Sequence, residues 1–358
     1  MCLEISNHLR IRCAYFKQIR LENNQYKIYF LTYDTKNNAR AAVKYIYDTV
    51  LTLREEGLDA HILVEDKAYI GVESWMGDKY KDLPIVTIKE DQIEMGIDDV
   101  IVVPEYYSNV LEQLKDVKCT KVMLVQQTEY IFETLQVGSR WSDYGFDKVI
   151  TTTKSSKQYI QTVFPESIIY INPPKISDIF KPTESLTKPF IAISARDRGQ
   201  HRRVISEFYL RYPQLRWVTF KDMVQMSHEE FAKQLQECIC SVWLDDDSTF
   251  GTFPLESMKC QVPVIGKIPT TEPEWLSENG LWTYDLNKIV ELLGTYVLAW
   301  LEGVTINDEV KSKMSETLIP YSADIIDSNV ISIFNSLKNS RIKTIENGLT
   351  NLKSKIEA

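Results

Sequence analysis

The feature that most constrains the fold is a recurring pattern of short apolar runs, rich in Ile, Val and Tyr, with helical segments between them. The runs occupy residues 27–34, 59–65, 99–104, 121–126, 148–153 and 167–172 in the first half of the chain, and 190–195, 215–220, 240–244 and 262–266 in the second. Buried runs of this length that alternate with helices are typical of parallel strands joined by crossover helices. The sequence therefore predicts an α/β protein with parallel sheets.

The length of the chain and one break in its composition indicate two domains. At roughly 100 to 200 residues per domain, 358 residues favour two domains over one. The stretch from Asn172 to Pro189 is rich in proline and polar residues and lacks apolar periodicity, as expected of an interdomain connection. The predicted division is an N-terminal extension at 1–25, an α/β domain at 26–175, a linker at 176–189, a second α/β domain at 190–320 and C-terminal helices at 321–358. Because ligands of such sheets bind at the carboxyl ends of the strands, we expect a binding cleft between the domains.

Charge and apolar patterning limit where this chain acts. Lys and Arg total 41 and Asp and Glu total 50, so the net charge is −9, which disfavours a protein that coats nucleic acid. No apolar stretch approaches the roughly 18 residues needed to cross a bilayer, and residues 1–20 are too polar for a signal peptide. Six scattered cysteines are typical of reduced thiols. We expect a cytoplasmic protein whose residues 1–25 are a plain extension or, in the alternative interpretation, a weak amphipathic contact with a membrane surface.

The densest group of candidate residues lies between Trp243 and Lys267. There a strand ends in acids, a tight turn follows at Phe250-Gly251-Thr252, and a helix begins near Pro254 with Glu256 in its first turn. A glycine turn that leads into a helix exposes backbone N–H groups that can bind phosphate oxygens. A carboxylate beside them can accept hydrogen bonds from a ribose diol. In the alternative interpretation, Glu256 only caps its helix.

The string FGTFPLESMKCQVPVIG resembles the donor-binding signature of family 4 of the retaining glycosyltransferases, approximately E-x-F-G-x-x-x-x-E-A-M-A-C-G-x-P-V-I. The likeness rests on Phe250, Gly251, Glu256, Met258, Cys260, Pro263, Val264 and Ile265. It implies the GT-B fold, in which two Rossmann-like domains with parallel sheets face a central cleft and a C-terminal helix closes back on the first domain. It also implies that Glu256 holds the ribose of a nucleotide sugar, while the backbone from Gly251 through Thr252 to Phe253 contacts the diphosphate and the sugar.

The chain departs from this signature at the first glutamate, where it has Ser248. In the family that carboxylate orients the hydroxyls of the donor sugar. The resemblance leaves three possibilities: Asp247 replaces the carboxylate, the sugar is held differently, or the chain is inactive. The segment around Met223 resembles the loop that meets the nucleobase in the family.

A crowded group of arginines follows the apolar run at 190–195. The group comprises Arg196, Arg198, Arg202 and Arg203, with Asp197 as the nearby opposite charge. Guanidinium groups suit bidentate binding of phosphate, whereas a solvated basic loop is the alternative interpretation. The resemblance implies that Arg196 and Arg198 are the catalytic cations that neutralise the departing diphosphate, and that Arg202 can serve in place of Arg198.

The N-terminal domain resembles the family less closely. Members often have a Gly-Gly turn after the first strand, and here the turn is Thr35-Lys36-Asn37-Asn38, in which asparagine tolerates the left-handed conformation. Gln126 and Glu129 match a Q-x-x-E pattern of rhamnosyltransferase-like members, at a place where many relatives have a histidine. The expected acceptor or sugar side of the cleft comprises Asn37, Asn38, Gln126, Gln127 and Glu129. Ordinary loop residues are the alternative interpretation.

Neither a metal nor an organic cofactor is predicted. The four histidines lack metal-ligand spacing, and the string Asp245-Asp246-Asp247, which contains a D-x-D pattern, is the one feature that favours a metal. Motifs of serine hydrolases, P-loop proteins and dinucleotide-binding dehydrogenases do not occur. With the resemblance, the sequence predicts a retaining, metal-independent hexosyl- or pentosyltransferase whose co-substrate is a nucleoside-diphosphate sugar.

Two alternative functions stay open. Ser248 and the missing histidine fit a non-catalytic relative that binds a sugar nucleotide or a glycan. Transfer to a modified nucleic-acid base would need a basic stripe lined by aromatic residues, and its candidates are Arg40, Lys44, Arg140 and Trp141. The acceptor is left open between a glycan, a lipid-linked molecule and a nucleic-acid base, and so is the oligomeric state.

Overall fold

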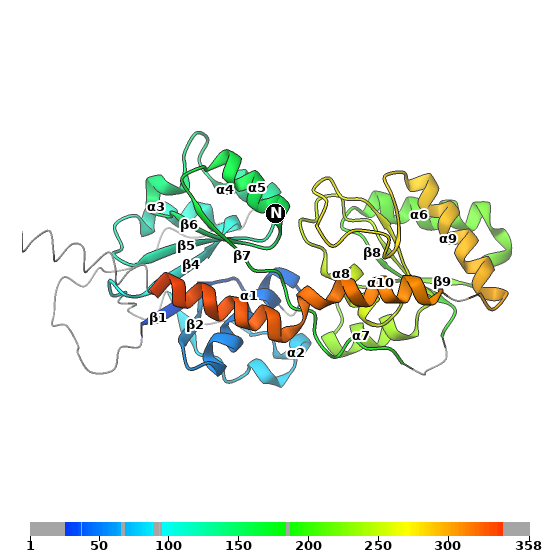
Figure 1. The fold of residues 1–358 in the computed structure, drawn as a ribbon, viewed down its shortest axis with the longest axis horizontal. Helices are drawn as coiled ribbons and strands as arrows, with labels where there is room; N and C mark the ends of the chain where they lie inside the picture. The colour runs from blue at the N-terminus through cyan, green and yellow to red at the C-terminus, as the bar shows by residue number, and fades with distance from the viewer. Residues whose placement is uncertain are drawn as a thin grey trace, which may run out of the picture.

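The computed structural model describes residues 26–338, apart from 37, 66–68, 89–92, 94, 184–186 and 305. In this part, the chain forms two α/β domains, each built on a parallel sheet (Figure 1). The predicted extension at 1–25 and the C-terminal residues beyond 338 lie outside the described residues. No helix of the described part is long and apolar enough to span a membrane.

The first sheet has seven parallel strands in the order β3-β2-β1-β4-β5-β6-β7. The strands are β1 (Lys27–Leu31), β2 (Asp59–Val64), β3 (Ile85–Thr87), β4 (Val100–Pro104), β5 (Thr120–Val125), β6 (Lys148–Thr151) and β7 (Ile168–Ile171). The connections contain α1 (Ala41–Glu55), α2 (Glu73–Met76), η1 (Asp78–Tyr80), η2 (Glu105–Val110), α3 (Leu111–Leu114), η3 (Thr128–Tyr130), α4 (Ile131–Thr134), η4 (Trp141–Tyr144) and α5 (Lys154–Val163). The strand order reverses between β1 and β4, which opens a crevice at their carboxyl ends.

The second sheet has five parallel strands in the order β12-β11-β10-β8-β9. The strands are β8 (Phe190–Ser194), β9 (Thr219–Asp222), β10 (Cys240–Trp243), β11 (Val264–Lys267) and β12 (Leu281–Thr283). The connections and the segment after the sheet contain α6 (Arg198–Arg211), η5 (Pro213–Leu215), α7 (His228–Glu237), α8 (Thr252–Lys259), α9 (Leu286–Leu301), α10 (Asp308–Leu318) and η6 (Ile319–Tyr321). Here the order reverses between β8 and β10, so the second crevice opens after these two strands.

Strand prediction was right in type and wrong at a few boundaries. The run predicted as a strand at 215–220 is one only from Thr219 onward, because Pro213–Leu215 forms a turn of 3-10 helix first. β3 and β12 were not predicted, since each is a three-residue edge strand too short to show a pattern.

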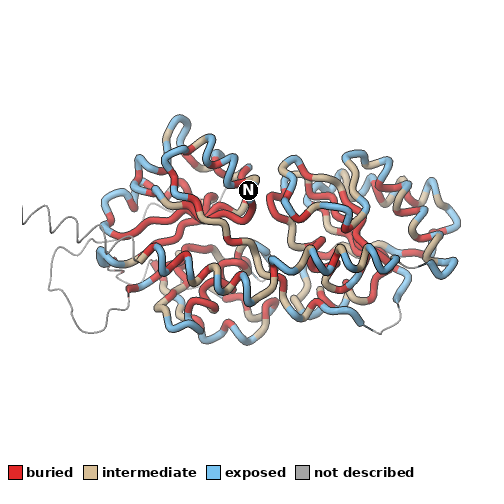
Figure 2. Tube along the Cα trace, viewed as in Figure 1, coloured by how far each residue is buried: buried red, intermediate tan, exposed pale blue. Residues whose placement is uncertain are grey.

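Both faces of each sheet are buried at its central strands, which explains why strands such as β4 and β10 are buried along their whole length. Side chains that alternate along β1 enter different hydrophobic clusters, Ile28 and Phe30 on one face and Tyr29 and Leu31 on the other. Figure 2 shows the buried segments following the strands in both domains. Helices therefore cover both faces, and polar groups collect at the ends of the strands.

A helix from 323, described to 338, crosses from the second domain back to the first (Figure 1). Its apolar residues Val330, Phe334 and Leu337 join the same cluster as Phe30 of β1. The fold class predicted from the sequence, with two Rossmann-like domains and a C-terminal helix that returns to the first, is confirmed.

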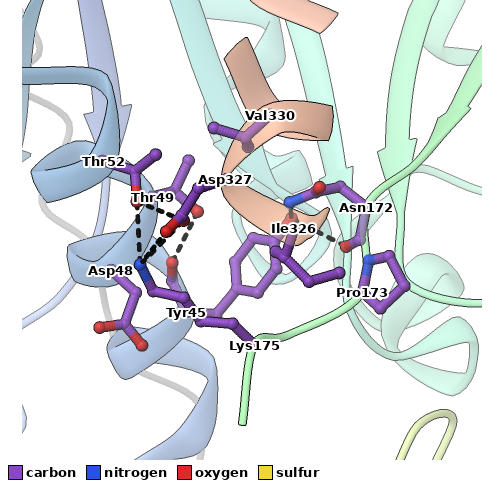
Figure 3. Close-up of a pocket in the computed structure, with 10 residues that line it drawn as sticks. All are labelled: Tyr45, Asp48, Thr49, Thr52, Asn172, Pro173, Lys175, Ile326, Asp327 and Val330. Carbon is purple, nitrogen blue, oxygen red and sulfur yellow. Dashed lines mark hydrogen bonds and ion pairs between the residues drawn. The ribbon is translucent and has the colours of Figure 1, made fainter. Parts of the chain in front are cut away.

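Polar contacts fix this returning helix beside the connection between the domains (Figure 3). The ammonium of Lys175 lies 2.8 Å from Asp327 and 3.0 Å from the hydroxyl oxygen of Thr52 in α1, and that hydroxyl donates to Asp327 at 2.6 Å. The side-chain amide of Asn172 donates to the Tyr45 hydroxyl at 2.9 Å. We call Thr52, Lys175 and Asp327 the hinge cluster, because it joins α1, the connection and the helix at one point.

Replacing Asp327 by Ala should lower the midpoint temperature of thermal unfolding. The Lys175 side chain is 17% exposed and would lose its counter-ion, at a cost of about 1–3 kcal/mol. The matched control is Asp324→Ala on the exposed side of the same helix, expected to change stability by less than about 0.5 kcal/mol. Equal effects of the two substitutions in thermal unfolding would contradict this role of the hinge cluster.

Candidate active site

Asp245 joins the loops that follow β8 and β10. Its Oδ1 accepts the backbone N–H of Arg196 at 2.7 Å, and its Oδ2 accepts the indole N–H of Trp243 at 3.2 Å. The two strands are neighbours in the second sheet, with Ser194 paired to Trp243. Arg196 and the segment from Asp245 to Gly251, here called the donor loop, are thus brought to the same edge of the sheet.

The donor loop ends in a turn that only glycine fits well. Gly251 has φ of +72°, and a Cβ added there would lie 2.5 Å from the ring of Trp243. Phe250 just before it is buried, and its carbonyl accepts the indole N–H of Trp275 at 2.7 Å. α8 then begins at Thr252 without a side-chain cap hydrogen bond, so its first N–H groups, those of Thr252 and Phe253 among them, are not used by a cap.

Replacing Gly251 by Ala should destabilise the donor loop by about 2–4 kcal/mol, from the left-handed backbone and the clash with Trp243 together. Gly303 offers a matched control, because it has φ of +80° and open space where a Cβ would lie. Gly303→Ala should cost only the backbone part, about 1–2 kcal/mol. Chemical denaturation of the two variants measures the difference, and equal losses would show that the Trp243 contact is unimportant.

Glu256 lies in the second turn of α8, not in the first turn as the sequence suggested, because the helix begins two residues earlier than Pro254. The side chain is 9% exposed and makes no hydrogen bond or ion pair within the described part of the chain. The interpretation that it caps α8 is therefore wrong. Burial raises the pKa of Glu256 to about 7, and the ammonium of Lys44 in α1 opposes that rise from the first domain.

The side chain of Lys44, in α1 of the first domain, is held in place by buried partners. Its ammonium lies 2.5 Å from the carboxylate of Asp48, which also accepts a hydrogen bond from the Tyr80 hydroxyl. Burial alone would raise the pKa of Asp48, but the pairing with Lys44 and the Tyr80 bond hold that pKa below its ordinary value. The ammonium of Lys44, paired with Asp48, thus acts electrostatically on Glu256 from the first domain.

Replacing Glu256 by Gln should flatten the pH dependence of stability. A carboxyl group whose pKa rises from 4.5 to about 7 on folding binds more protons in the native state, so stability falls as pH rises through this interval. The loss should be on the order of 2–4 kcal/mol between pH 4.5 and 7 in the wild type, and this share should be missing in Glu256→Gln. Denaturation across pH measures it, with exposed Glu229→Gln as the control. A wild-type slope in Glu256→Gln would contradict the shifted pKa.

The arginines divide into one unpaired and one paired group. Arg196 is exposed, and its guanidinium has no ion-pair partner in the described part of the chain. Arg198 pairs with Asp222 at the end of β9, and Arg203 pairs with Glu207 at 2.7 Å. Arg202 is exposed on α6. Among the predicted phosphate ligands, Arg196 and Arg202 therefore carry uncompensated charge.

The basic loop expected after β8 is instead the start of a helix. α6 begins at Arg198, because Asp197 caps it by accepting the N–H of Gly199 at 2.7 Å. Met223 follows β9 directly, and its N–H donates to the carbonyl of Ile193 at 3.0 Å. Its side chain is buried in the core of the second domain, and its N–H is engaged, so only its backbone carbonyl could contact a nucleobase.

The acidic string after β10 is largely engaged in protein contacts. Asp246 forms an ion pair with Lys267 at 2.6 Å and accepts from Gln200 at 2.6 Å, while both oxygens of Asp245 are used as described above. Asp247 is exposed and Ser248 beside it is buried. Within the described ranges, no group of three or more His, Cys, Asp or Glu side chains could hold a metal ion.

The residues predicted for the acceptor side of the cleft also differ in whether protein contacts engage them. Gln126 donates its side-chain amide to the carbonyl of Ala42 at 3.1 Å, which ties the end of β5 to α1. Gln127 is buried, whereas Glu129 is exposed at the domain interface. The hydroxyl of Thr249 in the donor loop donates to Glu129 at 3.4 Å and accepts the N–H of Thr128 at 3.2 Å. These two threonines were missed, since nothing in the sequence marks either as an interdomain contact.

The turn after β1 differs from the one expected. The N–H of Asn38 donates to the carbonyl of Thr35 at 3.0 Å, and among the described residues of this turn Lys36 has positive φ, at +48°. The side chain of Asn38 binds the carbonyls of Thr35 and Lys36, so it stabilises the turn itself. Asn37 lies outside the described residues.

The stripe considered for a nucleic-acid base acceptor does not form. Trp141 is fully buried and stacks on Phe164, with ring centroids 4.2 Å apart. Arg140 pairs with Glu166 at 3.3 Å, and Lys44 faces Asp48. No aromatic surface is therefore left among these candidates.

A cavity of about 500 Å³ lies between the domains on the side of the connection. Its lining includes Lys154 and Ile171 from the first domain and Glu274, Trp275 and Tyr321 from the second. None of the predicted site residues lines it. The donor loop touches this lining through Phe250, whose carbonyl accepts the indole N–H of Trp275 and whose ring packs against Tyr321 with centroids 5.3 Å apart.

Two Rossmann-like domains with parallel sheets and a returning C-terminal helix make up the GT-B architecture of glycosyltransferases, and solved structures agree. Anabaena Alr3699/HepE in complex with UDP-glucose superimposes with a TM-score of 0.64 at 13% identity, covering 87% of this chain and 99% of that one. A sucrose-phosphate synthase from Thermosynechococcus elongatus gives a TM-score of 0.61 at 12% identity, covering 88% of this chain and 100% of that one. At these identities the likeness establishes the fold.

One characterised relative is similar in sequence. An alpha-1,6-glucosyltransferase of Actinobacillus pleuropneumoniae serotype 7 (strain AP76) is 24% identical over 268 residues, which is 70% of this chain and 78% of that protein. No family model matches the chain.

Proposed function

We propose that this chain is a retaining glycosyltransferase that moves a glucosyl group from UDP-glucose to an acceptor hydroxyl without a metal ion. The observation that carries the proposal is the contact that brings the backbone of Arg196 and the donor loop to one edge of the second sheet, with the buried Glu256 in the helix that follows the loop. The similar glucosyltransferase and the UDP-glucose complex of the structural neighbour support this choice of sugar and nucleotide.

Each part of the site has a chemical task in this proposal. The bond between the sugar C1 and the diphosphate oxygen breaks, and a bond from the acceptor oxygen to C1 forms on the same face of the sugar, while the proton of the acceptor hydroxyl passes to the departing diphosphate oxygen. Negative charge develops on the leaving UDP, where the guanidinium of Arg196 and the free N–H groups at the start of α8 stabilise it. Arg198 contributes once its pairing with Asp222 loosens, with Arg202 as its replacement.

Glu256 is assigned to the ribose, because a buried carboxylate without protein partners can accept hydrogen bonds from two neighbouring hydroxyls. Asp247 is the exposed acid nearest Ser248 and is assigned to the hydroxyls of the sugar. Asn37, Asn38, Gln126, Gln127 and Glu129 stay assigned to the acceptor or sugar side, although the backbone N–H of Gln127 binds Glu105. A cytoplasmic location is part of the proposal, since the four described cysteines are free thiols.

Replacing Arg196 by Ala should lower the rate of UDP release from UDP-glucose by about 10²- to 10³-fold, because a charge-stabilising group at the leaving diphosphate is lost. Thermal unfolding should stay unchanged, since the side chain is exposed and only its backbone N–H binds Asp245. Arg216→Ala, which removes another exposed arginine of the same domain, should leave the rate unaffected. Wild-type turnover in Arg196→Ala would remove the phosphate role, and a wild-type rate that depends on added divalent cations would contradict metal independence.

Ser248 favours a second candidate, a protein that binds the sugar nucleotide without transferring the sugar. This candidate predicts that UDP raises the unfolding temperature of the wild type, as any ligand of the native state does, while UDP-glucose stays intact. If the wild type releases UDP from UDP-glucose faster than Arg196→Ala does, the protein is an enzyme and this second candidate is excluded.

A further inference from the structure

Glu105 is a buried acid that the proposed chemistry does not use. It is the first residue of η2, directly after β4, and is 1% exposed. No ion pair to it occurs in the part of the chain that the structure describes. An acid without a cation in an apolar core is costly, so its retention calls for a specific contact.

The contacts of Glu105 reach the loop after the neighbouring strand. Its Oε1 accepts the backbone N–H of Gln127 at 2.8 Å, although the two residues are on different strand ends. Its own carbonyl accepts the hydroxyls of Ser108 at 2.8 Å and Thr134 at 3.1 Å, which fixes the residue from η2 and α4. The carboxyl group therefore sets the position of the chain where it leaves β5.

The next residue of that chain carries the contact with the second domain. The N–H of Thr128 donates to Thr249 of the donor loop at 3.2 Å, and Thr249 donates to Glu129 at 3.4 Å. Two successive N–H groups thus bind in opposite directions, that of Gln127 into the first domain and that of Thr128 across to the donor loop. A shift at Glu105 would be passed directly to Thr249.

We propose that Glu105 is a positioning residue for sugar transfer, which places the loop from Gln126 to Glu129 so that it meets the donor loop at Thr249. This inference rests on the proposed function. It assigns Glu105 no contact with substrate, and its effect on the reaction runs through Gln127, Thr128 and Thr249.

The charge of Glu105 is part of this role. Burial raises its pKa to about 8, although backbone hydrogen bonds such as that from the Gln127 N–H oppose the rise, and Glu129 of η3 adds to it, so the group is mostly neutral at pH 7. The other titratable groups that face it are Tyr33 after β1 and Tyr106 in η2, and Arg40 lies near Tyr33. Ionisation of Glu105 would repel the Glu129 carboxylate that binds Thr249, and would thereby weaken the interdomain contact.

A double-mutant cycle tests the inference. Glu105→Leu and Thr249→Val should each lower kcat/KM for UDP release from UDP-glucose by about tenfold, the effect of one net hydrogen bond. If Glu105 acts through Thr249, the double variant should be no worse than the poorer single variant, whereas independent roles would multiply to about a hundredfold. Multiplied effects would overturn the proposal.

Two further variants keep the test valid if Glu105→Leu folds poorly. Glu105→Gln keeps a neutral acceptor for the N–H of Gln127 and should retain wild-type activity at pH 7. Its rate relative to wild type should rise above pH 8, because only the wild type ionises there. Glu112→Gln, an exposed acid in α3, should follow the wild type at every pH. A constant ratio of Glu105→Gln to wild type up to pH 9 would overturn the proposal.

The outcome is separable from that of the proposed function. A wild type that neither binds UDP nor releases it from UDP-glucose contradicts the transferase itself. An active wild type with additive variants leaves the transferase standing and removes only the role of Glu105.

Discussion

The carboxylate of Asp245 is the contact on which the arrangement of the site depends. By binding the Arg196 N–H and the Trp243 indole, it fixes two loops that are far apart in sequence to one edge of the second sheet. The oriented Trp243 ring in turn leaves room only for glycine at 251, which sets where α8 begins. Both Asp245 oxygens are engaged in this way, so under the proposed function the charge of a leaving diphosphate would be met by Arg196 and the start of α8.

The two domains impose opposing influences on Glu256. Burial disfavours its charged form, and Lys44, held by Asp48 and Tyr80, favours that form from the other domain. A ribose diol that donates hydrogen bonds to the carboxylate would also favour the charged form. Since the unliganded group has a pKa of about 7, donor binding near neutral pH would release a proton, which links nucleotide affinity to pH.

The sequence predicts what depends on pattern and fails where the outcome depends on three-dimensional packing. Runs buried on both faces identified the long strands, and the glycine turn before Glu256 identified the donor loop. Arg198 was predicted to lie in a loop, because the arginines here were interpreted as phosphate ligands. Asp197 was not recognised as the residue that caps α6, and the structure places Arg198 at the first position of that helix. Glu105 and the Thr128–Thr249 contact carry no local signal: residues 121 positions apart meet only after two sheets have formed and faced each other.

The contacts between the domains differ in strength along the interface. At the hinge cluster, Lys175, Thr52 and Asp327 form a partly buried charged network that keeps the C-terminal helix on the first domain. At the cleft, the described links include single hydrogen bonds such as that from the N–H of Thr128 to Thr249 at 3.2 Å. Each such bond contributes about 1 kcal/mol net, so this side of the interface is held by weak contacts. A separation of the domains at the cleft would therefore break the Thr128–Thr249 contact, while the ion pair of Lys175 with Asp327 would be kept.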